Sequence, residues 1–145
     1  MSVNFGRAAL GGFVGMLAMT AMMYMVAPMM GLHMDIAAML GKALGVGWAA
    51  GLVMHFVNGT LIFPAVYAFV VASSLPGGPV VKGTMWGVIL WLIAQLVVMP
   101  MMGAGVFSSE MGGMMAAGGS LVGHLLYGAL LGAIAGAPEL RVAHA

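Results

Sequence analysis

Four long stretches without a charged residue set the main constraint on this chain. They cover 27, 39, 27 and 28 residues, at positions 8–34, 43–81, 83–109 and 111–138. About 20 apolar residues are enough for an α-helix to cross the hydrocarbon core of a bilayer. Each stretch can therefore hold one membrane-spanning helix, and we expect an integral membrane protein in contact with the lipid bilayer.

The composition supports a single helical membrane domain. Only 5% of the 145 residues are charged, whereas a soluble domain carries about a quarter, and the length suits one domain. The stretches lack the alternating pattern of a membrane β-barrel, so helices are left as the way to satisfy the backbone in lipid. The chain has no cysteine, which excludes thiolate chemistry, and no basic run that would indicate nucleic-acid binding.

We predict an all-α bundle of four transmembrane helices in one domain, residues 1–145. A segment rich in proline and glycine at 73–83 is typical of a turn, so the 39-residue stretch holds one span only. The predicted spans are 8–28, 47–72, 84–103 and 117–137.

The basic residues favour one orientation in the membrane. With a cytoplasmic amino terminus, Arg7, Lys82 and Arg141 fall on the cytoplasmic side and Lys42 on the other, as the positive-inside rule prefers. We therefore expect a multi-pass protein of the cell inner membrane with both termini in the cytoplasm. The opposite side is named the outer side here.

Two helical hairpins, residues 8–72 and 84–137, are predicted to form an internal repeat. The sequence PMMG ends the first and third spans, at 28–31 and 100–103. Each PMMG precedes an outer segment and then a returning helix with a histidine near its outer end. This arrangement indicates parallel repeats, related by a pseudo-twofold axis along the membrane normal.

The two outer segments are expected to form short interfacial helices on the outer side. The first places apolar residues on one helical face and is expected to have Asp35 as its N-cap. The second places Met111, Met114 and Met115 on one face, behind Ser108 or Ser109 as the cap. Its glycines make it the weaker helix.

His55 and His124 are the candidate functional residues. Each lies about eight residues inside the outer end of its span, at a depth of roughly 12 Å. Small residues at four-residue spacing mark faces where membrane helices approach closely, so both histidines should face the bundle interior. The residues that share their faces are Gly47, Gly51 and Gly59 in the second span and Ser120, Gly128, Gly132 and Gly136 in the fourth.

Two inward imidazoles at one depth suit the axial ligation of haem b, and imidazole also binds copper and zinc. In this interpretation Gly59 and Gly128 leave room for the haem ring, and Asn58 and Tyr127 are the polar neighbours of that ring. The alternative is that the histidines only form hydrogen bonds between helices. The protein would then be a structural or assembly subunit of a larger membrane complex, without a cofactor.

A second alternative is a protein that handles Cu(I) at a methionine-rich outer face. Thioether sulfur is a soft ligand that selects Cu(I), and MMGLHM places His33 among Met29, Met30 and Met34. Methionine also fills irregular gaps in apolar packing, so the high number of methionines on the outer side can be explained without a metal.

Hydrolytic chemistry has little support in this sequence. No acidic residue lies in a predicted span, so a Ser-His-Asp triad cannot be assembled there. Phosphate loops and HExxH motifs are absent too. We therefore expect an accessory subunit for binding or electron transfer, without catalytic activity of its own. It would associate with other membrane subunits or with itself.

The motifs HFVNG at His55 and HLLYG at His124, each followed by small residues, resemble those of the YagU-like group of small bacterial membrane proteins. The resemblance covers most of the chain and implies the same four-span fold. It assigns a function to no residue.

Overall fold

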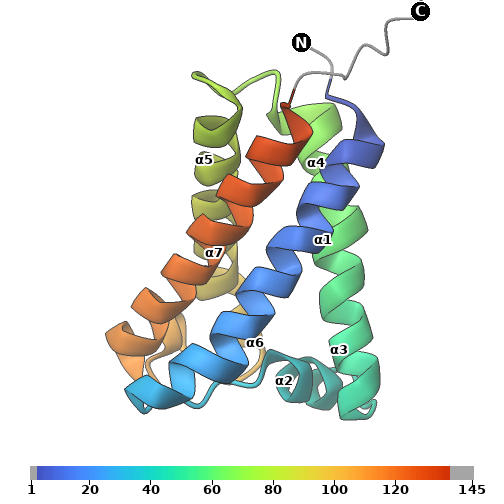
Figure 1. Ribbon diagram of the computed structural model, residues 1–145. Coiled ribbons are helices and arrows are strands. Elements are labelled where there is room, and N and C mark those ends of the chain that lie inside the picture. Colours follow the sequence, from blue (N-terminus) through green and yellow to red (C-terminus); the bar gives the residue numbers. More distant parts are fainter. Residues whose placement is uncertain (1–2, 138–145) are drawn as a thin grey trace, which may run out of the picture.

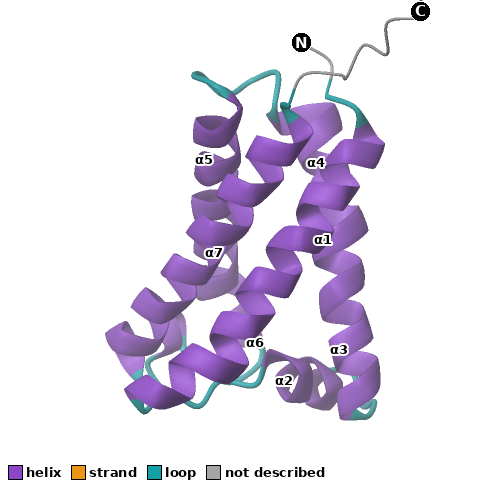
Figure 2. Cartoon of the chain, viewed as in Figure 1, coloured by secondary structure: helices purple, strands orange, loops and turns teal. Residues whose placement is uncertain are grey.

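The computed structural model describes residues 3–137, and within that range the chain forms helices and loops without a strand. Four helical segments are long and apolar enough to cross a membrane, which confirms the predicted fold class (Figures 1 and 2). Spans 1 to 4 are Phe5–Met30, Trp48–Val71, Pro79–Met101 and Gly113–Ala135.

Three of the four spans contain turns of π- or 3-10 helix. Span 1 consists of α1 (Phe5–Ala21), the π turn η1 (Met22–Val26) and the 3-10 turn η2 (Ala27–Met30). Span 2 consists of α3 (Trp48–Val57), the π turn η3 (Asn58–Ile62), α4 (Phe63–Val66) and the π turn η4 (Tyr67–Val71). Span 3 consists of α5 (Pro79–Ile93), the π turn η5 (Ala94–Val98) and α6 (Met99–Met101). Span 4 is the single helix α7 (Gly113–Ala135).

Helix α7 lies between α1 and α5 and packs along both (Figure 1). Span 2 packs on α1 mainly through η3 and α4, and α3 diverges from α1 toward one end of the molecule. The short helix α2 (Ile36–Ala43) packs against α3 there, and we name this the α2 end. The opposite end carries the loop 72–78 between spans 2 and 3 and is named the loop end.

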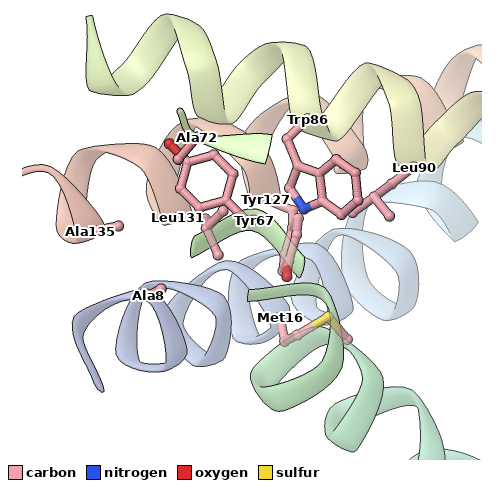
Figure 3. Close-up of a cluster of buried hydrophobic side chains, with 9 residues drawn as sticks. All are labelled: Ala8, Met16, Tyr67, Ala72, Trp86, Leu90, Tyr127, Leu131 and Ala135. Atoms are coloured by element: carbon pink, nitrogen blue, oxygen red, sulfur yellow. The ribbon is translucent and has the colours of Figure 1, made fainter. Parts of the chain in front are cut away.

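All four spans contribute to one buried apolar cluster on the loop-end side of the bundle (Figure 3). Tyr67 and Tyr127 are its largest fully buried side chains. Burying such rings contributes strongly to stability because each removes a large area from contact with its surroundings. The members are Ala8, Met16, Tyr67, Ala72, Trp86, Leu90, Tyr127, Leu131 and Ala135.

The starts of spans 3 and 4 differ most from the predicted boundaries, by five and four residues, and both differences have local reasons. Span 3 begins at Pro79 rather than 84, because proline is well suited to the first helical position, where its missing N–H costs nothing. The first outer helix is present as α2, with Asp35 as its N-cap. The second outer segment forms only a 3-10 turn, η6 (Val106–Ser108). Gly112 and Gly113 have φ of 96° and 58°, and this left-handed backbone leads into α7, which begins four residues earlier than expected.

Three prolines inside spans are each preceded by a π turn. Proline has no N–H, and its ring clashes with the carbonyl four residues back, so the helix widens by one residue just before it. In each case the residue before the proline donates its N–H to the carbonyl five residues back. These bonds run from Ala27 to Met22, from Phe63 to Asn58 and from Met99 to Ala94.

The two PMMG sequences end their helices in the same way. Gly31 and Gly103 are both left-handed, with φ of 75° and 79°. The N–H of the residue after each glycine bonds to the carbonyl five residues back at 2.9 Å, which is a Schellman motif. This similarity supports the internal repeat, although the segments that follow differ, and the duplication itself stays a prediction.

Asp35 joins three segments at the α2 end. Its carboxylate accepts hydrogen bonds from the Tyr24 hydroxyl at 2.7 Å, from Trp48 Nε1 at 2.9 Å and from the Ala38 backbone N–H at 3.0 Å. Burial alone would raise the pKa of the Asp35 carboxyl, but the hydrogen bonds outweigh it and hold that pKa below its usual value. The ionised carboxylate therefore links span 1, α2 and span 2.

Two basic side chains bind the carboxyl ends of helices at the loop end. Arg7 donates from Nε and Nη2 to the Ile134 carbonyl at 3.2 and 2.9 Å. Lys82 Nζ donates to the Ala72 carbonyl at 2.6 Å. Cations at these positions are favoured by the helix dipole. Both residues thus have a structural role beside their use in the orientation argument; Arg141, also used there, lies outside the described residues.

Candidate functional site

The imidazole of His124 is held in one tautomer. Its Nδ1 lies 2.8 Å from the carbonyl oxygen of Ser120, one turn earlier in α7. A carbonyl can only accept, so Nδ1 carries the hydrogen and Nε2 keeps its lone pair. The same arrangement orients histidines that bind metals.

His55 presents a ring nitrogen that is buried and unsatisfied. Its Nε2 has no hydrogen-bond partner among the described residues, and its ring meets that of Phe56 edge-on, with centroids 6.2 Å apart. An unpaired polar atom inside a membrane bundle costs free energy. A bound group that pairs with this nitrogen would remove the cost.

A contact between spans 2 and 4 places the two histidines at one level. The Tyr127 hydroxyl donates to the Gly59 carbonyl at 2.7 Å, and Met16 fills the space in front of Gly59. Spans 1, 2 and 4 therefore meet at this level. His55 in span 2 and His124 in span 4 each lie about one helical turn from this contact, on the side of the α2 end.

In span 1, Thr20 lies one helical turn from Met16 toward the α2 end. Its buried Oγ1 also lacks a hydrogen-bond partner in residues 3–137. The neighbouring Met19 lies 3.3 Å from the position that a Cβ on Gly123 would take, so spans 1 and 4 are in contact here. We name Thr20, His55 and His124 the polar layer.

The other residues predicted to hold a cofactor take part in helix packing. A Cβ on Gly59 would collide with Met16, and one on Gly128 would collide with the backbone of α5 at Gly83. Tyr127 is 2% exposed and its hydroxyl is used by Gly59. Asn58 is half-buried at the start of η3. The space next to the two glycines is therefore filled by protein atoms.

A crevice and a smaller cavity lie outside the polar layer. A crevice of about 380 Å³ runs between α1 and α3, and its walls are almost entirely apolar. The second, about 180 Å³, lies at the α2 end where span 1 turns into α2; we name it the Met23 cavity. Its lining residues are Met23, Tyr24, Pro28, Leu32, His33, Met34 and Asp35.

The structure divides the four residues predicted to bind copper. His33 and Met34 line the Met23 cavity. Met29 and Met30 do not line it, and they are 86% and 62% exposed. Met23 was missed by the sequence analysis, because its neighbours in the cavity come from a segment that folds back beside span 1. In residues 3–137 no three His, Asp or Glu side chains are grouped as a metal site.

Gln95 is a buried polar residue outside the polar layer, and it forms a hydrogen bond with Ser108 rather than with a histidine. It is fully buried in η5, and its Oε1 accepts a hydrogen bond from Ser108 Oγ at 2.9 Å. Its Nε2 has no partner among the described residues. The signal in the sequence was a single amide in the otherwise apolar run 85–101.

One comparison with known proteins gave a match. The family described as "Family of unknown function (DUF6789)" matches residues 2–144. The chain belongs to this family. Neither the curated proteins nor the solved structures contain a match. Membership in DUF6789 does not bear on the resemblance to the YagU-like group, which stays a prediction, and it assigns no ligand to the polar layer.

Proposed function

We propose that this protein is a small membrane subunit that holds haem b between His55 and His124 and serves electron transfer. The observation that supports the proposal is a pair of ring nitrogens, one on each histidine, that have no hydrogen-bond partner among the described residues and lie at one level of the bundle. His124 Nε2 is left free by the bond from Nδ1 to Ser120, and His55 Nε2 is buried without a partner. A bis-histidine haem needs two such atoms.

The donor set fits a haem iron, and the packing limits where the ring could lie. The side chain of Met16 and the backbone of α5 fill the space in front of Gly59 and Gly128. A porphyrin would therefore lie on the α2 side of these glycines. When bound, the haem iron supplies one-electron chemistry, while the protein orients the ligands and excludes water.

An absorption spectrum of the protein purified from its native membrane tests this proposal. We expect a Soret band and a change on reduction with dithionite. His55→Ala and His124→Ala should each abolish the band, because each removes one axial ligand. His33→Ala is the matched control, because His33 lies outside the polar layer, and it should leave the spectrum unchanged. His55→Met retains a potential ligand and should raise the reduction potential.

The proposal is overturned if the wild-type protein has no Soret band, or if both alanine variants keep it. Metal analysis of the same samples separates haem from a copper or zinc ion held by the two imidazoles. Circular dichroism on each variant shows whether the helices are retained. A folded protein without haem or metal would favour the structural or assembly subunit instead.

We also propose that the α2 end faces outward from the inner membrane and the loop end faces the cytoplasm. Arg7 and Lys82 at the loop end support this orientation under the positive-inside rule. Because the chain has no cysteine, Ser74→Cys and Ser109→Cys each introduce a single thiol, one at each end. On cells with a permeabilised outer envelope, a membrane-impermeant maleimide should label Ser109→Cys at once and Ser74→Cys only after lysis. The reverse order would contradict the orientation.

A further inference from the structure

The Met23 cavity brings together side chains whose free donors are soft. Two thioethers, from Met23 and Met34, and the imidazole of His33 line a space of about 180 Å³. This volume is below the range of typical organic-ligand pockets, but it is large enough for a single ion. We propose that the cavity binds one Cu(I) ion through Met23, His33 and Met34.

The hard donors of the cavity are already engaged. Asp35 accepts hydrogen bonds from Tyr24, Trp48 and the Ala38 backbone, and both of its oxygens are used. The Tyr24 hydroxyl is the donor in the first of these bonds. Carboxylate and hydroxyl oxygens suit Mg²⁺, Ca²⁺ and Mn²⁺. Because these oxygens already take part in hydrogen bonds, the thioether sulfurs and the imidazole are the donors left for an ion. This donor set selects Cu(I).

An ion could reach the cavity from the surface and would lie close to a negative charge there. His33 is exposed, so the cavity opens to the surface at the α2 end. The ionised carboxylate of Asp35 forms part of the wall, and a single negative charge stabilises a monovalent cation at short range. Met23 continues the face of span 1 that carries Thr20, so the cavity lies about one turn from the polar layer.

Binding of Cu(I) to the purified full-length protein, measured in competition with a chromogenic Cu(I) chelator, tests the proposal. We expect one ion per chain. Met23→Leu, Met34→Leu and His33→Ala should each weaken binding about tenfold or more. Leucine is close to methionine in volume, so these variants should still fold. Met29→Leu and Met30→Leu are the matched controls, because both side chains lie outside the cavity, and they should bind as the wild type does.

Three results would overturn the proposal. The first is a wild-type protein that does not retain Cu(I) against the chelator. The second is an effect of Met29→Leu or Met30→Leu equal to that of Met23→Leu. The third is loss of Cu(I) in a folded variant carrying His55→Ala and His124→Ala, because the ion would then lie in the polar layer. Retention in that double variant, together with sulfur scatterers in the copper X-ray absorption spectrum, supports the Met23 cavity independently of the haem proposal.

Discussion

Replacing Gly128 with alanine is expected to disrupt the packing of α7 on α5. The added Cβ would overlap the carbonyl oxygen of Gly83 and lie 3.0 Å from the backbone nitrogen of Gly87. Both obstacles are backbone atoms, so the helices would have to move apart along their whole contact. Overpacking of this kind costs about 1–3 kcal/mol and occasionally more, and we expect a loss of at least about 2 kcal/mol.

The same substitution elsewhere in α7 provides the control. Gly118 has no heavy atom within 4 Å of the position of an added Cβ, and alanine is favoured over glycine in a helix by about 1 kcal/mol. Gly118→Ala should therefore keep or slightly raise stability. Unfolding both variants in mixed micelles with increasing SDS, followed by circular dichroism, measures the difference. Equal stability of the two variants would contradict the close contact with α5.

Tyr127→Phe should lower the free energy of unfolding by about 1 kcal/mol, which is the usual size of a hydrogen bond between membrane helices. The Gly59 carbonyl needs this partner because the helix does not supply one. Phe63, the usual donor to Gly59, bonds to Asn58 instead, and Pro64 has no N–H. The tyrosine hydroxyl, at 2.7 Å, takes the place of the missing donor.

A double-mutant cycle with Pro64→Ala isolates this effect. Without proline the π turn can return to an α-helix, and Phe63 can then donate to Gly59. Tyr127→Phe should therefore cost less in the Pro64→Ala background than in the wild type. The two costs are measured by the same SDS titration. Strict additivity would show that the hydroxyl does not replace a helical donor.

The four spans could be predicted because their length and lack of charge leave one structural solution in a membrane. The start of α7 could not, since it depends on the left-handed backbone of Gly112 and Gly113 rather than on hydrophobicity. The π turns were missed for a related reason. A proline signals a weakened helix, but whether the chain kinks or widens there depends on its neighbours in the fold.

The candidate site was predicted only in part. Small residues at four-residue spacing predicted that His55 and His124 face the interior, and the buried Nε2 of His55 agrees with this prediction. The same glycines were expected to leave room for a ring, whereas the structure fills the space beside them with Met16 and α5. A glycine in a sequence marks a place without a side chain, and only the fold decides whether a neighbouring helix occupies it. Met23 lacked any local signal, because its partners follow the turn at Pro28.

The two ends of the molecule differ in how they respond to acid. At the loop end, Arg7 and Lys82 donate hydrogen bonds to carbonyl oxygens, which carry no titratable proton. At the α2 end, Asp35 holds Tyr24 and Trp48 through an ionised carboxylate whose pKa is lowered by the fold. That stabilisation is present above the ordinary pKa of aspartate and is lost as the pH falls through the lowered one. An acidic compartment on the α2 side would thus weaken the links that join Tyr24, α2 and Trp48, and would leave the hydrogen bonds of the loop end in place.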